Sequence, residues 1–445
     1  MAALTITVFI LTYIGMAVGR VPGLRLDRSG IALIAAVILV ALGSITPEQI
    51  AGAIHFPTVI LLFALMIVSA RFAGAGFYDV CAAWIAEHRG SATTLLALTV
   101  AVGGALSAVL VNDVVVFVMT PLLCTGLVRR GLDPRPFLAA LAGASNAGSA
   151  ATIIGNPQNI VIGQVGGLHF ATFTAVCAIP ALLALVIVFL CVRLVWSKQL
   201  KGVATPRDVA AVPAYDRPET LKAAVATLLL LAMFLTPLSR EMSALLVASV
   251  LLMSRRFSSR DMLTSVDWPL LLLFVGLFVV NGALAETGLT ADVMIWLAER
   301  GWLPDRLSLM APMALVASNT VGNVPTVVML LTVWRDIPEG ALYALALLTT
   351  FAGNFFLVGS IANLIVAERA AHAGVRFGFV DQARAGVPMT VISMAIAIAW
   401  LQLGPGEPAI NPGPRGMIAQ AIHDAADHCG GSGDVVVTVS VPGGA

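Results

Sequence analysis

The sequence predicts an all-α polytopic membrane protein with about ten transmembrane helices and two re-entrant hairpins, arranged as two inverted-topology repeats. Three observations lead to this fold class. The 445 residues are 59% hydrophobic and 11% charged, with a mean hydropathy of +0.96, which is far more apolar than a soluble domain. Apolar runs of about 15 to 25 residues recur along the chain, the length of a membrane helix and not of a barrel strand. Two of these runs contain clusters of Asn, Ser and Gly, and the first of them also contains Pro157.

Ten apolar runs have the length of a bilayer span. They lie at about 3–19, 30–46, 56–75, 137–165, 170–196, 221–237, 242–255, 268–286, 341–367 and 386–403. Two further apolar regions, 91–130 and 307–334, are interrupted by Asn112-Asp113 and by Gly322-Asn323 with Pro325. We expect each of them to fold as a re-entrant helical hairpin. The chain then divides into a first repeat half (1–200), a linker (201–220), a second repeat half (221–403) and a polar Gly/Pro-rich tail (404–445).

The basic residues predict the orientation of these spans. Counting crossings places the basic loops on one face of the membrane, including Arg20, Arg25 and Arg28 after the first span and Arg71 at the end of the third. The positive-inside rule assigns this face to the cytoplasm. We therefore expect a multi-pass protein of the plasma (inner) membrane with its amino terminus outside and the linker 201–220 in the cytoplasm. The first run lacks a basic segment before it and is long enough to span, so we expect no cleavable signal peptide.

The two halves of the chain match each other in order. The repeat-related pairs are Pro57/Pro269, Gly76/Gly288 and Trp84/Trp296 at an offset of 212, Asn112/Asn323 at 211, and Gly155/Gly359 and Asn159/Asn363 at 204. Five crossings separate each residue from its mate, and an odd number means that the second copy is inserted upside down. Inverted repeats are typical of secondary transporters, whose sites lie at the repeat interface near the middle of the membrane.

Polar residues inside the apolar runs form the candidate site. Unwound backbone and bare amides survive at membrane depth only where protein buries them or where they line a wet cavity. Pro157 releases backbone carbonyls one turn earlier, and glycines allow close approach. The candidate binding residues are Asn112, Asp113, Ser145, Asn146, Gly155, Asn156, Pro157 and Asn159 in the first half, and Ser318, Asn319, Asn323, Pro325, Asn354, Gly359, Ser360 and Asn363 in the second. Small residues and Asn also join helices, which is the structural alternative.

Asp113 is the only carboxylate at a hairpin break, because Val324 follows Asn323 in the repeat mate. An intramembrane carboxylate predicts an ion-linked role, either coordinating Na⁺ or carrying a proton. A transported Na⁺ is therefore expected near Asn112, Asp113 and Asn323, and a structural cap is the alternative. We expect no structural metal and no cofactor, since the six histidines have no ligand spacing.

Other classes of protein are disfavoured. No GxxxxGK[ST] motif is present in the sequence, which argues against a built-in ATPase. No two catalytic-type groups converge on one intramembrane position, so we do not expect an enzyme. The net charge of +1 gives no reason to expect nucleic acid as a partner.

The motifs resemble those of the ion transporter superfamily, in particular the branch of citrate-transporter-like permeases, arsenite efflux permeases and NhaD-type antiporters, which is related to the divalent anion:sodium symporters. The resemblance is carried by VNDVVVFVMTP at 111–121, GSAATIIGNPQNIVIG at 148–163, VGNVPTVVMLL at 321–331 and GNFFLVGSIANLIVAE at 353–368. It implies elevator-like alternating access, cation- or proton-coupled movement of an anion, and a homodimer. The first tip, Val111-Asn112-Asp113, departs from the Ser-Asn-Thr triplet of the dicarboxylate symporters.

These observations together predict a secondary active transporter of a small anion, either a carboxylate or an inorganic oxyanion, coupled to Na⁺ or H⁺. Its expected partners are the anion, the coupling cation and the lipid bilayer. The alternative is a Na⁺/H⁺ antiporter, in which Asp113 exchanges the two cations and no anion moves.

Overall fold

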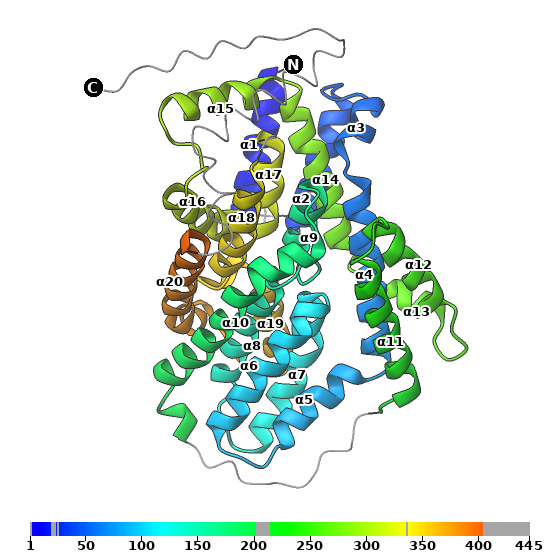
Figure 1. Ribbon diagram of the computed structural model, residues 1–445, viewed down its shortest axis with the longest axis vertical. Helices are drawn as coiled ribbons and strands as arrows, with labels where there is room; N and C mark the ends of the chain where they lie inside the picture. Colours follow the sequence, from blue (N-terminus) through cyan, green and yellow to red (C-terminus); the bar gives the residue numbers. More distant parts are fainter. Residues whose placement is uncertain (1, 19–23, 25, 202–213, 335–336, 404–445) are drawn as a thin grey trace.

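The computed structural model describes residues 2–18, 24, 26–201, 214–334 and 337–403. All regular structure within these ranges is helical, which confirms the predicted all-α class (Figure 1). The tail 404–445 and most of the linker 201–220 lie outside the described residues, and so do the predictions made for them.

Among the described residues, six helices are long and apolar enough to cross a membrane: α4 (Phe56–Gly74), α6 (Ala92–Val109), α7 (Asn112–Arg129), α10 (Phe170–Val195), α14 (Trp268–Ala285) and α20 (Phe379–Leu403). The helices α4, α10, α14 and α20 coincide with predicted spans. The helices α6 and α7 are the two arms of the first predicted hairpin. Each arm has 18 residues, enough for a span of its own. The re-entrant path and the total of ten crossings therefore stay predictions.

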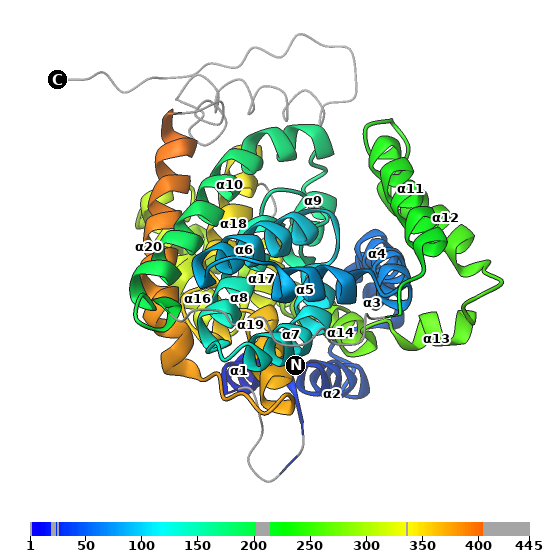
Figure 2. The ribbon, with the colours of Figure 1, turned by 90° about the horizontal axis from the view of Figure 1, so that it is seen from below.

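One group of helices packs around α4 and α14, and we call it the α4/α14 bundle. Its other members are α1 (Ala2–Val18), α2 (Arg28–Ala41), α3 (Pro47–Ala53), α11 (Arg217–Met233), α12 (Arg240–Leu252) and α13 (Ser259–Thr264). Local capping starts several of these helices. The side chains of Asp27, Asp216 and Asp267 each accept a backbone N–H in the first turn of the helix that follows, which satisfies donors that have no partner within the helix. Figure 2 shows α11, α12 and α13 on the outer side of α4.

The remaining helices form the α8/α18 bundle. Besides α6, α7, α10 and α20, its members are α8 (Arg135–Ser149), α9 (Pro157–Val165), α16 (Leu307–Thr320), α17 (Asn323–Val333), α18 (Glu339–Ala352), η2 (Leu357–Gly359) and α19 (Ile361–His372), and a short η1 (Gln199–Lys201) follows α10. The helices α6 and α8 touch through their backbones. A Cβ added to Gly148 would lie 2.1 Å from the carbonyl oxygen of Gly104, so only glycine permits this approach.

Two short helices connect the bundles. Both α5 (Phe77–Glu87) and α15 (Leu289–Glu299) have 11 residues, and both follow a repeat-related glycine in the left-handed region, Gly76 at φ +75 and Gly288 at φ +77. The helix α5 leaves α4 and packs on α7. Figure 1 shows α15 at one end of the molecule and α5 towards the other.

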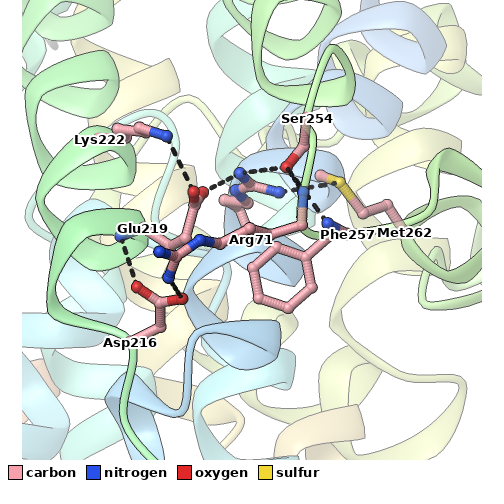
Figure 3. Close-up of polar contacts among 8 residues, drawn as sticks. Arg71, Asp216, Glu219, Lys222, Ser254, Phe257 and Met262 are labelled. Carbon is pink, nitrogen blue, oxygen red and sulfur yellow. Dashed lines mark hydrogen bonds and ion pairs between the residues drawn. The ribbon is translucent and has the colours of Figure 1, made fainter.

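A buried ion pair joins α4 to α11 (Figure 3). The guanidinium of Arg71 pairs with the carboxylate of Glu219, and the two side chains are 3% and 1% exposed. Lys222 donates to the same carboxylate at 2.8 Å, and Arg71 also donates to Ser254 Oγ at 2.9 Å. The guanidinium lies over the ring of Phe257, 4.6 Å from its centroid. Arg71 is thus a buried residue within α4 and not a loop cation as the charge pattern predicted, because Glu219 compensates its charge.

Candidate functional site

The run predicted to be a broken span is broken at the predicted place. The helix α8 ends at Ser149, and α9 begins at Pro157. The side chain of Asn156 caps α9 by accepting the N–H of Asn159 at 2.8 Å. Asn159 Nδ2 in turn donates to the carbonyls of Ser149 and Thr152, both at 3.2 Å. These amides therefore satisfy backbone groups that the break leaves without helical partners.

The second broken span repeats this arrangement between α18 and α19. Asn363 Nδ2 donates to the carbonyls of Gly353 at 2.7 Å and Phe356 at 3.1 Å. These acceptors lie 204 residues after Ser149 and Thr152, the same offset that relates Asn159 to Asn363. The repeat found in the sequence is therefore also a repeat of hydrogen bonds.

The two breaks meet in one network of side chains. Asn146 Nδ2 donates to the Oδ1 atoms of Asn354 at 2.8 Å and Asn363 at 3.1 Å, and Asn146 Oδ1 accepts from Ser360 Oγ at 3.0 Å. All four side chains are at most 2% exposed. We call Asn146, Asn354, Ser360 and Asn363 the amide network. It joins residues from both halves of the chain and contains no charged side chain.

Thr350 lies outside the predicted set. It contacts the first break from the second half of the chain, as Asn146 contacts the second break from the first half. It lies 204 residues after Asn146, and its Oγ1 accepts from Asn156 Nδ2 and Gln158 Nε2, both at 3.3 Å. Thr350 Oγ1 also donates to Asn159 Oδ1 at 3.5 Å. Applying the repeat offset to Asn146 would have found Thr350 in the sequence. Gln158 lies within the GNPQN motif but outside the predicted set.

The first helix pair, α6–α7, is bonded at its tip to the first break. The backbone N–H of Asn112 donates to the carbonyl of Gly155 at 3.2 Å, and Ser145 Oγ donates to the carbonyl of Asn112 at 3.5 Å. Ser107 Oγ donates to Ser145 Oγ at 3.2 Å. Three predicted residues, Asn112, Ser145 and Gly155, are therefore brought together here. Asn112 Oδ1 is buried and has no hydrogen-bond partner among the described residues.

The second helix pair, α16–α17, is bonded differently. Within the described part of the chain, no bond joins the N–H of Asn323 to Gly359, the pair related by the repeat to Asn112 and Gly155. Instead, Asn319 Nδ2 donates to the carbonyl of Ala352 at 2.9 Å. A Cβ added to Gly359 would lie 2.4 Å from Asn319 Oδ1, so a larger residue at this position would displace the Asn319 side chain. The tips of the two helix pairs thus differ in their hydrogen bonds to the neighbouring break.

The tip of α16–α17 also contacts the α4/α14 bundle. Tyr13 Oη donates to the carbonyl of Pro325 at 3.4 Å and accepts from Asn281 Nδ2 at 3.0 Å. Ser318 is fully buried, and its Oγ has no hydrogen-bond partner among the described residues. The predicted residues Ser318, Asn323 and Pro325 therefore lie outside the amide network.

Asp113 lies in the first turn of α7 and is 7% exposed. No hydrogen bond or ion pair reaches its carboxylate from the described residues. Besides the amide network, the candidate residues therefore include three buried groups with unused bonding capacity: Asn112 Oδ1, Ser318 Oγ and the carboxylate of Asp113.

A cavity of about 470 Å³ lies between the two bundles, and we call it the interbundle cavity. The α4/α14 bundle lines it with Asp27, Arg28 and Asp267, and the α8/α18 bundle lines it with residues that include Ile361 and Glu368. Ile361 directly follows Ser360 of the amide network. Burial and the nearby Asp27 carboxylate raise the pKa of Asp267 above its usual value, because burial disfavours the charged form and Asp27 disfavours a second negative charge beside it.

Apolar helices that break around buried amides define a multi-pass membrane transporter. A family model described as "Citrate transporter" matches residues 7–340. The chain belongs to this family, within the ion transporter superfamily. A second model, described as CbiD, matches only residues 395–445, which lie almost entirely outside the described residues.

Three relatives are similar over nearly the whole chain. An uncharacterized transporter of Mycobacterium tuberculosis is 30% identical over 91% of this chain and 99% of its own length. The putative transporter arsB of Dictyostelium discoideum is 23% identical over 84% of this chain and 87% of its own length. The silicon efflux transporter LSI3 of Oryza sativa is 27% identical over 85% of this chain and 93% of its own length. The family and these names indicate a transporter and not an enzyme.

Proposed function

We propose that the chain is a secondary active transporter of a small anion, either an inorganic oxyanion or a carboxylate, coupled to Na⁺ or H⁺. The observation that carries the proposal is the amide network, in which Asn146 from one broken helix bonds to Asn354, Ser360 and Asn363 from the other. Amide and hydroxyl groups supply the donors that an oxygen-rich solute needs. Relatives named for arsB and for silicon efflux support a solute of this kind.

Transport in this proposal is an elevator-like movement of the α8/α18 bundle against the α4/α14 bundle. The movement needs connections that bend, and α5 and α15 supply them, since Gly76 and Gly288 place a left-handed turn before each helix. The halves 1–200 and 221–403 then act as inverted repeats, with two re-entrant hairpins and ten crossings. The amino terminus lies outside, and the working unit is a homodimer in the plasma membrane.

The test is flux in proteoliposomes that contain a pH-sensitive dye. Na⁺ alone is added first, followed by succinate, citrate, sulfate and arsenite, each with and without Na⁺. A signal that requires one of these solutes supports the proposal, and its dependence on Na⁺ identifies the coupling ion. We expect Asn159→Ala to reduce this signal by at least tenfold, and unchanged transport would remove Asn159 from the mechanism.

The alternative function is a Na⁺/H⁺ antiporter. The observation that favours it is the buried Asp113, whose carboxylate has no described partner and is free to bind either cation. In that case Na⁺ alone dissipates a pH gradient, and Asp113→Asn abolishes the response. A pH gradient that persists after Na⁺ is added, together with transport that survives Asp113→Asn, would exclude this function.

A further inference from the structure

We infer that Arg240 and Arg28 are two latches, that is, side chains that bond one bundle to the other and close opposite ends of the interface between the bundles in alternation. In this structure the Arg240 latch is made and the Arg28 latch is released. The inference rests on the proposed transport function, because it assigns the contacts that hold each end closed during the movement of the bundles. It follows from the repeat, from the hydrogen bonds at one end and from the cavity at the other.

The repeat makes the two arginines equivalent. Arg28 is the first residue of α2 and Arg240 the first residue of α12, and they are separated by 212 residues, the offset that also relates α4 to α14. The helices that follow the two breaks, α9 and α19, are related by the offset of 204. Inverted repeats place equivalent groups at opposite ends of their interface. A contact of Arg240 with α9 at one end therefore predicts a contact of Arg28 with α19 at the other.

Arg240 joins the two bundles at its end of the interface. Its Nη1 donates to the carbonyl of Leu168 at 2.7 Å, and its Nη2 donates to the carbonyl of Gly163 at 2.8 Å. Both carbonyls lie at the carboxyl end of α9, where the partial negative charge of a helix favours a cation. Beside this contact, Gln164 Nε2 donates to Glu241 Oε2 at 3.3 Å. Since α9 also packs on α4, this end of the interface is closed.

The equivalent end is open. The interbundle cavity separates α19 from α14, which are the repeat mates of α9 and α4, and Arg28 lies on its wall. Arg28 Nε donates to the carbonyl of Met16 at 3.1 Å, a residue of its own bundle. Arg28 Nη1 lies beside Gly322 at the tip of α16–α17, but within the described part of the chain neither Nη atom donates a hydrogen bond. The second arginine is thus in place without the bonds that its mate makes.

A second pair of side chains supports the same closure. Glu368 is the repeat mate of Gln164 at the offset of 204, and Ser29 is the mate of Glu241 at 212. The bonded pair at the closed end has an amide donor on α9 and a carboxylate acceptor on α12. In the other copy the carboxylate is on α19 and a hydroxyl donor is on α2, and both line the interbundle cavity. Closing the cavity therefore brings a donor and an acceptor together again, with their roles exchanged between the bundles.

The first experiment is cross-linking across the cavity. Ser29→Cys and Glu368→Cys are combined in the full-length chain without its native cysteines and treated with a short bis-maleimide. Gln164→Cys and Glu241→Cys form the matching pair at the closed end. Both pairs should cross-link, because each end is closed in one of the two arrangements. The control pair, Ser29→Cys with Gln164→Cys, takes one position from each end and should not cross-link.

Arginine variants test whether the two latches compete. Arg240→Gln removes two hydrogen bonds at the closed end, so the rate of cross-linking by the Ser29/Glu368 cysteine pair should rise about tenfold, equivalent to about 1.4 kcal/mol. Arg28→Gln should lower this rate, and the double variant should return it to within about threefold of the parent. Arg255→Gln removes an exposed arginine outside the cavity and should leave the rate unchanged.

Two results would overturn the inference. One is a Ser29/Glu368 cysteine pair that does not cross-link in any variant. The other is a rate that changes in the same direction in Arg28→Gln and Arg240→Gln without recovery in the double variant, which would show that both arginines have only structural roles. Gel filtration establishes that each variant is monodisperse. If Arg240→Gln is not recovered as folded protein, a rate in Arg28→Gln equal to that of the parent would overturn the inference by itself.

Flux measurements separate this inference from the proposed function. Cross-linking needs no solute, so it decides the role of the latches even if the parent moves none of the solutes tested and the proposed function fails. If the parent transports a solute, cross-linking the Gln164/Glu241 cysteine pair should abolish its flux, because that end can no longer open. Flux that continues after complete cross-linking would overturn the inference and leave the proposed function intact.

Discussion

The substitution Asn146→Ala tests the amide network at its centre. It removes three side-chain hydrogen bonds, those to Asn354, Asn363 and Ser360, and leaves their buried polar atoms without these partners. Hydrogen bonds between membrane helices contribute about 0.6 kcal/mol on average and up to about 1.7 kcal/mol. Three of them give a loss of about 2 kcal/mol, with an upper bound of about 5 kcal/mol.

The same substitution should also lower the rate of transport. The amides of Asn354 and Asn363 lose the donor that fixes their orientation, and misplaced binding groups cost up to about a hundredfold in rate. We expect kcat/KM for the transported solute to fall between tenfold and a hundredfold, roughly. The assays are solute flux in proteoliposomes and thermal unfolding in detergent micelles.

A matched control is Asn281→Ala, because Asn281 is also fully buried but bonds to Tyr13 and to the carbonyl of Leu277 instead of to the network. It should lower the melting temperature by a similar amount and leave the KM within twofold. Flux by Asn146→Ala equal to that of wild type would refute the assignment of the network to the transport site. A melting temperature of Asn146→Ala equal to that of wild type would show that these hydrogen bonds do not stabilise the fold.

Three further predictions concern the rest of the molecule. Glu219→Ala should destabilise the protein by about 3–5 kcal/mol, because it leaves the charge of Arg71 buried and unpaired, whereas the double variant with Arg71→Met and Glu219→Leu should unfold within a few degrees of wild type. Gly148→Ala should cost about 1–3 kcal/mol or more through overpacking, while Gly52→Ala, whose Cβ meets no atom within 4 Å, should be neutral in the same thermal assay. The raised pKa of Asp267 means that the folded protein holds this proton to higher pH than the unfolded chain. The resulting stability is present in acid and is lost as the pH rises through the folded pKa, so the melting temperature should fall over this range. Asp267→Asn should make that fall smaller.

Much of the broken-helix geometry could be predicted from local sequence. Proline at position 157 and the capping asparagine before it determine where α9 begins, because both act through their own backbone and that of the next turn. The repeat offset extended this result to the second break, where Asn363 makes the bonds that Asn159 makes in the first. Short-range chemistry and internal symmetry were therefore sufficient to place these residues.

The contacts between the bundles could not be predicted in the same way. Arg28 approaches Gly322, and Arg71 pairs with Glu219, although both pairs are distant in sequence and carry no shared local signal. In the sequence, Arg71 looks like a loop cation because it stands near the end of an apolar run. Only the folded structure shows that the carboxylate of Glu219 compensates its charge. The path of α6–α7 is a further case, since a predominantly apolar arm of 18 residues fits both a full crossing and a deep hairpin.

The difference between the two helix-pair tips suggests a second conformation in which the two halves exchange their arrangements. The N–H of Asn112 is bonded to Gly155, and the equivalent bond from Asn323 to Gly359 is not made. If the two halves exchanged conformations, the second tip would be bonded and the first released, with the same number of such bonds in total. This one bond therefore favours neither arrangement over the other. Positions where the copies differ, such as Asp113 opposite Val324, then decide which arrangement is favoured, and an ion that binds one arrangement better shifts the preference towards it.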